Sequence, residues 1–223
     1  MKNHLNFFNI LLVLFVKKER GKLMNKHYAL FLKLVLSACV IIFVSGCSTT
    51  MKLHYVKPPF KKMNKGEIYV VVDDQRSSEK GGNDPTRVGT IRNSFGMPFP
   101  LNSSVNREPS KVIKELVSDC LKAAGYKISV QPDSAPQLHV VLQKFWSDGY
   151  QHSRIWTKIA VELKKDEHSQ PVWKHIFESN IGVTWKAGYG PFDKGINSML
   201  EEVKNKMIAE FKDPKFSKSL KSL

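Results

Sequence analysis

The chain has 223 residues, of which 42% are hydrophobic and 25% charged, with 35 Lys and Arg against 20 Asp and Glu. This hydrophobic content excludes a globally disordered chain, and the length suits one domain behind a targeting segment. The net charge of +15 fits a nucleic-acid partner, an anionic membrane surface or simple solubility. Which of these three explanations of the charge applies depends on where the protein is located.

Residues 1–47 have the order of an export signal. Met24 opens a basic segment, "MNKHYALFLK", which is followed by the apolar run "LVLSACVIIF" and then by small residues before Cys47. This order is typical of a secretory signal. The apolar runs at 5–16 and 34–44 are both shorter than the roughly 20 residues that span a bilayer. We predict a signal peptide over 1–46, with translation starting at Met1 or at Met24.

The last residues of this signal, "VSGC", resemble the lipobox of bacterial lipoproteins. The resemblance implies cleavage between Gly46 and Cys47, and a diacylglycerol and an N-acyl chain on Cys47, with no other cofactor. Ser48 stands where an Asp would retain such a protein in the inner membrane, which implies the periplasmic face of the outer membrane. The alternative is that Cys47 is a buried cysteine of a core helix.

The segment 47–65 is predicted to be the lipidated cysteine and a basic tether. It contains Pro58-Pro59 and five lysines without an acid, and as a flexible coil it would span on the order of 25 Å. The lysines suit a solvated tether, and the alternative is contact with anionic lipid head groups. An exported protein rarely meets nucleic acid, so no nucleic-acid partner is expected.

The domain is predicted over 66–212, from its apolar patterns. Alternating or β-branched runs predict strands, and apolar residues at helical spacing predict two amphipathic helices. Pro109 suits the first turn of the first helix, and Gly125 suits its end. The predicted strands cover 67–74, 88–92, 126–131, 137–146, 154–164 and 171–183, and the helices cover 109–124 and 193–212.

This order predicts an α+β fold, with a mostly antiparallel sheet and both helices on one face, as a two-layer sandwich. Pro214 is expected to end the second helix, and residues 213–223 are expected to form a loose basic tail.

Several short motifs resemble one family of bacterial lipoproteins. They are the lipobox, the Asp-x-Arg after the first strand, "VGTIRN", "LKAAGY", "QLHVVLQKFWSDGY" and "FDKGINSMLEEV". Together they are similar to the YajG-type family of uncharacterised lipoproteins over 47–211. More loosely, the pattern resembles the auxiliary lipoproteins of ABC-type envelope transporters. Neither resemblance implies any catalytic residue.

No motif predicts catalysis or a metal. Asp73 and Asp74 are adjacent in a strand and point to opposite faces, so an Asp74–Arg76 interaction is a better prediction than a cation site. The histidines of the mature chain lack zinc-ligand spacing, and no phosphate loop or G-x-S-x-G turn occurs.

Cys120 belongs to the apolar stripe of the first helix, which indicates that it is a core residue and not a reactive thiol.

All four tryptophans lie in the last 80 residues of the chain, which indicates an aromatic core for most of them. Trp156 is out of phase with Ile155, Ile159 and Val161, so it should lie on the other face of its strand. Exposed aromatic residues mark contact surfaces. We predict a partner surface that includes Trp156, Phe145 and Trp173.

These observations favour a non-enzymatic, lipid-anchored binding or scaffold module, with other envelope proteins as partners and the membrane as anchor. It could serve as a peripheral subunit of an envelope secretion or transport complex. One alternative is an auxiliary lipoprotein of a lipid or solute transporter, with an apolar groove between sheet and helices. A weaker alternative is a cell-wall hydrolase.

Overall fold

The structure, a computed structural model, describes residues 49–223 except 78–79, 81, 93–95, 150–151 and 185–189. Cys47, the Gly46–Cys47 cleavage site and the predicted signal lie outside the described residues. The elements are β1 (Thr49–Met51), β2 (Glu67–Asp74), β3 (Arg87–Arg92), β4 (Pro98–Ser103), η2 (Val105–Arg107), α3 (Pro109–Ala124), β5 (Lys127–Ser129), η3 (Pro132–Ser134), β6 (Gln137–Gly149), β7 (His152–Lys164), β8 (Trp173–Thr184), α4 (Gly190–Lys212) and α5 (Pro214–Lys221).

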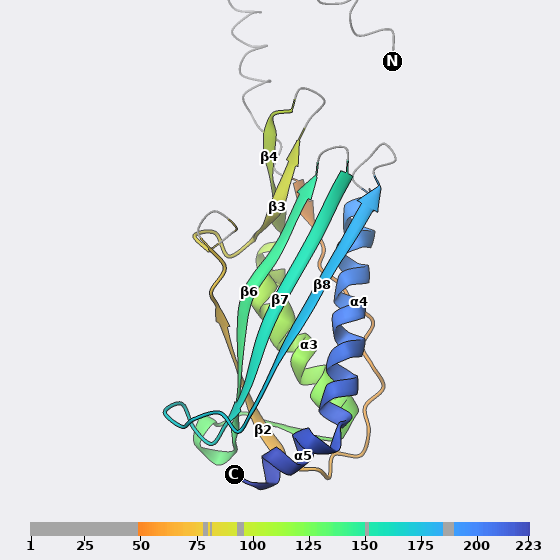
Figure 1. Cartoon of the computed structure of the whole chain (residues 1–223). Coiled ribbons are helices and arrows are strands. Elements are labelled where there is room, and N and C mark those ends of the chain that lie inside the picture. The colour runs from red at the N-terminus through yellow and green to blue at the C-terminus, as the bar shows by residue number, and fades with distance from the viewer. Residues whose placement is uncertain (1–48, 78–79, 81, 93–95, 150–151, 185–189) are drawn as a thin grey trace, which may run out of the picture. The chain divides into compact units, whose positions relative to one another are not determined.

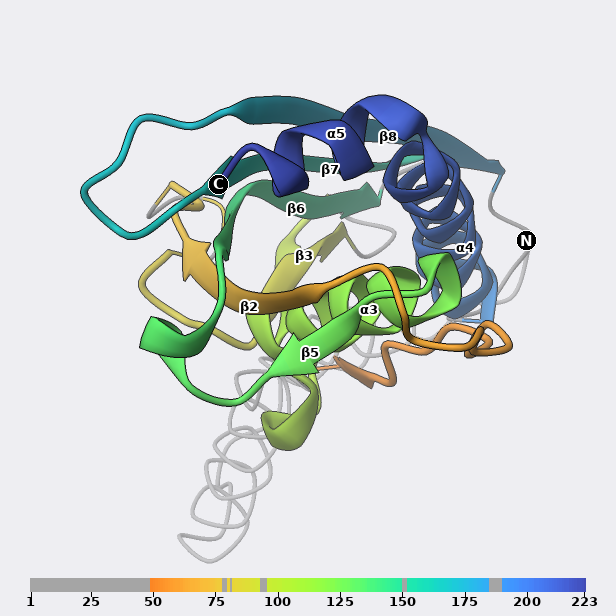
Figure 2. The same ribbon diagram turned by 90° about the horizontal axis from the view of Figure 1, so that it is seen from below.

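In the part of the chain that the structure describes, eight strands form one mixed sheet, with helices on one of its faces (Figures 1 and 2). The two longest pairings, β6–β7 and β7–β8, are antiparallel, as is β3–β4. The pairings β1–β4, β2–β5, β2–β6 and β3–β6 are parallel. The predicted α+β class with helices on one face is confirmed, and the parallel pairings of the shorter strands add to it.

Strands β2 and β3 follow one another along the same edge of β6, because β7 occupies its other edge. Tyr69–Asp74 lies opposite Gln137–Leu142, and Gly89–Ile91 lies opposite Ser147–Gly149. Gly89 is required at this junction, since a Cβ on it would lie 2.3 Å from the backbone oxygen of Ser147. The chain leaves the edge of β6 between β2 and β3 and then returns to it.

Arg76 holds this excursion together. Its guanidinium donates to both carboxylate oxygens of Asp74 at 2.8 Å, and to the backbone oxygens of Arg87 and Pro85. The Arg76 side chain has no exposed surface. The predicted Asp74–Arg76 interaction is therefore confirmed, and it closes the loop that separates β2 from β3.

The core lies between the sheet and the helices α3 and α4. Helix α3 contributes a fully buried stripe, and its end at Gly125 agrees with the prediction, because Gly125 has the left-handed φ of 102° that favours glycine. Helix α4 packs against β7, β8 and α3. No helix in the described part of the chain is long and apolar enough to span a membrane. The larger apolar side chains of α3 and α4 that are buried are Val112, Ile113, Leu116, Val117, Cys120, Leu121, Ile196, Met199, Leu200, Val203, Met207 and Phe211.

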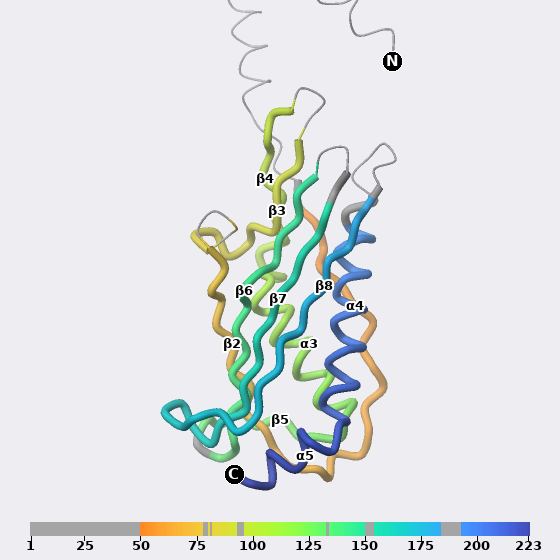
Figure 3. Tube along the Cα trace, viewed as in Figure 1, coloured from red at the N-terminus to blue at the C-terminus, as the bar shows by residue number. Residues whose placement is uncertain are grey.

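The predicted tether is wrong from Thr49 onward. Residues 49–65, here called the strap, begin as β1 and then run along the helices (Figure 3). Met51, Leu53 and Tyr55 alternate into the core with exposed fractions of 1–4%. Their alternation with Lys52 and His54 is a local signal that the tether prediction overlooked, although the elements that they contact are distant in the sequence.

Hydrogen bonds fasten the strap to both helices and to the turn before α3. Arg107 donates to the backbone oxygen of Leu53 at 2.9 Å, and the Tyr55 hydroxyl donates to Asp119 of α3 at 3.0 Å. Lys204 of α4 donates to the backbone oxygen of Val56 at 2.9 Å. The strap is thus part of the folded domain, which begins before the predicted boundary at residue 66.

The loose tail predicted for 213–223 is also wrong, because Pro214–Lys221 forms helix α5. Asp213 caps this helix by accepting a hydrogen bond from the backbone nitrogen of Lys215, and proline occupies its first turn. Phe216 and Leu220, one helical turn apart, are buried. Phe216 packs edge-on against Tyr126 and Trp173, which extends the core past α4.

Cys120 is fully buried, as predicted, and we expect its thiol to be inert in the folded protein. Burial, together with the neighbouring Asp119 carboxylate, raises the pKa of this thiol, so the reactive thiolate is suppressed. A chain starting at Ser48 should resist a thiol reagent at about pH 8 until it is unfolded. The matched control is Val130→Cys, an exposed position that should react at once. Fast labelling of the folded parent chain would contradict the expectation.

Candidate functional site

The sheet face opposite the helices is uncovered along β6, β7 and β8 (Figures 1 and 2). Ile155, Thr157, Ile159, Val161 and Leu163 of β7 are buried on the helix side. The alternate residues of β7, which include Trp156, therefore lie on the uncovered face. This confirms the predicted orientation of Trp156.

Trp146 of β6 lies directly opposite Trp156 of β7 in the antiparallel register. A β-bulge makes this pairing possible, because the register shifts between Leu142 and Lys144. Before the bulge Leu142 points into the core, and after it Phe145 does. The extra residue, Gln143, therefore turns Lys144 and Trp146 toward the uncovered face.

The same bulge corrects one predicted partner residue. Phe145 has no exposed surface and belongs to the core, so its assignment to a partner surface is wrong. Trp173 lies on the helix side of β8, where its ring packs against Phe211 and Phe216. Of the three predicted surface residues, only Trp156 lies on the uncovered face. Trp146 was missed, because the bulge that turns it toward the uncovered face leaves no signal in the strand pattern.

Three cations surround the tryptophan pair. Lys144 Nζ lies 4.8 Å from the centre of the Trp156 ring, and the Arg87 guanidinium carbon lies 5.9 Å from the centre of the Trp146 ring. Lys158 is the cross-strand neighbour of Lys144. We call these five residues the tryptophan patch. Cations over tryptophan faces are attracted by the ring quadrupole, which fixes their positions.

The patch has an excess of positive charge. Lys158 pairs with Glu178 of β8 at 2.9 Å, whereas Lys144 forms no ion pair with any residue that the structure describes. Partial burial lowers the pKa of Lys144, and the charges of Lys80 and Lys158 act in the same direction, whereas the Glu178 carboxylate acts against them. A bound anion would offset this repulsion.

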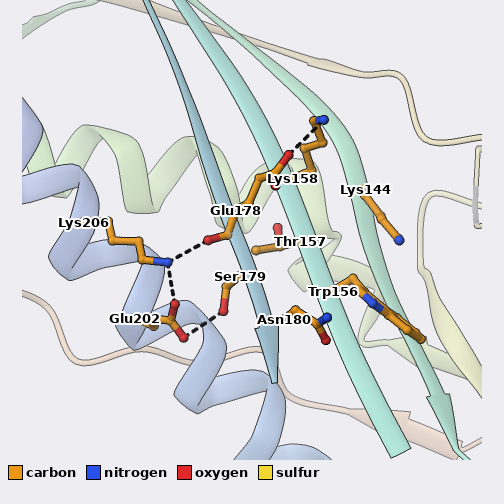
Figure 4. Close-up of a pocket in the computed structure, with 9 residues that line it drawn as sticks. All are labelled: Lys144, Trp156, Thr157, Lys158, Glu178, Ser179, Asn180, Glu202 and Lys206. Atoms are coloured by element: carbon orange, nitrogen blue, oxygen red, sulfur yellow. Dashed lines mark hydrogen bonds and ion pairs between the residues drawn. The ribbon is translucent and has the colours of Figure 1, made fainter. Parts of the chain in front are cut away.

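A hollow of about 490 Å³ adjoins the patch and extends to α4 (Figure 4). On its α4 side, Ser179 donates to Glu202 at 2.9 Å, and Lys206 donates to Glu202 and to the backbone oxygen of Glu178. Lys206 thereby covers part of the outer edge of β8, which protects this edge strand. The Thr157 hydroxyl, which also lines the hollow, is buried without a partner among the described residues.

The groups in this hollow suit binding better than catalysis. The hydrogen bond from Lys206 lowers the pKa of Glu202, with burial acting against it and Ser179 in the same direction. A carboxylate held ionised in this way is a weak general base near neutral pH. The described residues also contain no group of three or more His, Cys, Asp or Glu that could hold a metal ion.

No protein-family model and no curated protein matches the sequence. Among solved structures, the fold is similar to a Xanthomonas campestris protein of family DUF330, with 10% identity, a TM-score of 0.55, and coverage of 78% of this chain and 99% of that one. At this identity the similarity concerns the fold alone. The YajG-type resemblance remains a prediction.

Two weaker similarities carry no argument about function. One is to a Caulobacter crescentus protein provisionally described as a lipoprotein, at 11% identity and a TM-score of 0.34, covering 44% of this chain and 80% of that one. The other is to a Helicobacter pylori protein provisionally described as a homologue of a neuraminyllactose-binding haemagglutinin. It has 10% identity and a TM-score of 0.43, and covers 77% of this chain and 99% of that one.

Proposed function

We propose that the protein is a lipid-anchored, non-enzymatic binding module of the bacterial envelope, attached through Cys47 to the periplasmic face of the outer membrane. Its binding surface is the tryptophan patch, and its partner is an envelope protein with an acidic surface. The single observation that carries the binding role is the paired Trp146 and Trp156 on the uncovered sheet face, with three cations beside them.

The composition of the patch supports this role. Tryptophan and arginine are enriched among the residues that contribute most to protein interfaces, since they combine a large apolar area with a polar group. Lys144 and Lys158 select an acidic partner, because opposite charges across an interface speed association and exclude wrong partners. The described residues contain no comparable cluster that would support the transporter-auxiliary or the hydrolase alternative.

Trp156→Ala is expected to weaken partner binding by about 2 kcal/mol or more, roughly 30-fold. Its effect on the free energy of unfolding should be under about 1 kcal/mol, the size of a cross-strand pair. Crosslinking in native membranes followed by mass spectrometry measures the partner yield, and urea unfolding measures stability. The matched control is Ile176→Ala, an exposed residue of the same face beyond the patch.

The outcome that would overturn the binding role is an unchanged partner yield with Trp156→Ala and with Lys144→Glu. The anchor is tested separately by the intact mass of the mature protein. We expect a chain that starts at Cys47 and carries acyl groups. An unmodified N-terminus upstream of Cys47 would overturn the anchor and leave the binding test intact.

A further inference from the structure

The point at which the described chain begins fixes where an anchor on Cys47 is attached. Thr49 starts β1 and lies opposite Leu101 of β4 in a parallel register. Two residue steps join Cys47 to Thr49, and they span at most about 7 Å. Whatever membrane holds Cys47 is therefore close to this end of β1.

The strap leaves no slack after that point. Met51, Leu53 and Tyr55 are buried, and Arg107, Asp119 and Lys204 bind the strap by hydrogen bonds. A free tether would have let the domain move on the order of 25 Å away from the membrane. A docked strap instead limits the gap to the short connection before Thr49.

The end of the β3–β4 hairpin has exposed apolar side chains close to this end of β1. Because β1 and β4 are parallel, the end of β1 at Thr49 faces the same way as the end of β4 at Pro98. Met97 is 53% exposed, Pro98 is exposed and Phe99 is half-buried. Phe99, two residues from Leu101, lies at the level that Cys47 can reach, and Pro98 and Met97 lie beyond it toward the end of the hairpin.

We propose that this hairpin end, Met97–Phe99, rests on the bilayer that holds the acyl chains of Cys47. This inference rests on the proposed anchor.

The strand register then sets how far the binding surface lies from the bilayer, since Thr49, Leu101, Gly89 and Ser147 form one row across the sheet. Ser147 adjoins Trp146, so the tryptophan patch lies about 15–20 Å from Thr49 across three to four strand spacings. The partner of the patch is therefore a protein at the membrane surface.

A second amphipathic surface competes with the hairpin for the bilayer. The strap exposes Val56, Phe60 and Met63 among its lysines. Phe60 lies beside Lys122 in the last turn of α3, whereas Leu53 lies beside Arg107, which precedes that helix. The two ends of α3 are about 22 Å apart, so Phe60 and Met63 lie much farther than Met97 from the attachment point. The hairpin is the surface that the short connection favours.

The test couples a chain that starts at Cys47 to maleimide-lipid vesicles of phosphatidylethanolamine and phosphatidylglycerol. Cys120 is buried, so coupling is directed to Cys47. A genetically encoded fluorescent amino acid replaces Met97, Met63 or Val130, and brominated lipids act as quenchers. Val130, 93% exposed beside β5, serves as the distant control. We expect quenching and a blue shift at position 97, and neither at positions 63 and 130.

A flexible glycine-serine insertion between Ser48 and Thr49 should abolish the quenching at position 97, because it restores the slack. The inference is overturned if position 97 is not quenched, if position 63 or 130 is quenched as strongly, or if the insertion changes nothing. Because the lipid is attached chemically, these outcomes do not depend on acylation in cells. Failure of the anchor would be seen instead in the intact mass of the mature protein.

Discussion

Leu53→Ala is expected to lower the free energy of unfolding by about 2–5 kcal/mol, the cost of removing a buried leucine side chain. Leu53 is 1% exposed and belongs to the strap, which the sequence pattern assigned to a tether. In a flexible tether the same substitution would change almost nothing. Urea unfolding of a chain that starts at Ser48 measures the difference directly.

The matched control for this substitution is Lys57→Ala, an exposed residue of the same strap, which should change stability by less than about 0.5 kcal/mol. A chain that starts at Gly66 should lose more stability than Leu53→Ala, because Met51 and Tyr55 leave the core as well. If that shortened chain unfolded at the same urea concentration as its parent, the strap would be no part of the fold.

Asp74→Ala is expected to cost about 3–5 kcal/mol, since it leaves the fully enclosed Arg76 guanidinium without its counter-charge. The loop between β2 and β3 should loosen at the same time, because Arg76 also binds the backbone oxygens of Pro85 and Arg87. Urea unfolding measures the stability, and hydrogen exchange of the amides in β3 measures the loosening.

Glu67→Ala is the matched control, because Glu67 lies at the other end of β2 and pairs with the exposed Lys127. Surface pairs of this kind contribute less than about 1 kcal/mol. Equal losses for Asp74→Ala and Glu67→Ala would show that the enclosed pair has no special part in joining β2 to β3.

The elements that the sequence predicted well are those with a strong local period. Helix α3 begins at Pro109 and ends before Gly125 as expected, and β2 covers the predicted 67–74. The long strands β6, β7 and β8 agree with the predicted strands to within three residues at each end. In these segments the apolar residues recur about every 2 residues in the strands or every 3.6 residues in the helices. The local sequence alone therefore indicates the secondary structure of each segment.

Other elements were missed because their burial comes from distant contacts. Strand β4 contains Pro98 and Pro100, which weaken a strand pattern, yet it pairs with both β3 and β1. Helix α5 offered a local signal in Asp213, Pro214 and the spacing of Phe216 and Leu220. Its many lysines and serines concealed that signal.

The candidate site was only partly accessible from the sequence. The alternation of β7 was enough to place Trp156 on the far face, since one regular strand defines its own two faces. The bulge at Gln143 could not be seen, and it decided that Trp146 lies on the uncovered face and Phe145 in the core. A single extra residue reverses the faces of everything after it, so a strand pattern alone cannot locate such a shift.

By itself the sequence determined the α+β class, the main helices and strands, and the orientation of Trp156, because local periodicity encodes each of them. It also predicts the anchor on Cys47, which the structural description does not reach. Only the tertiary structure decided that residues 49–65 are a strap and not a tether, and that the tryptophan patch exists. Both depend on residues far apart in the chain, which meet only when the sheet and helices have assembled.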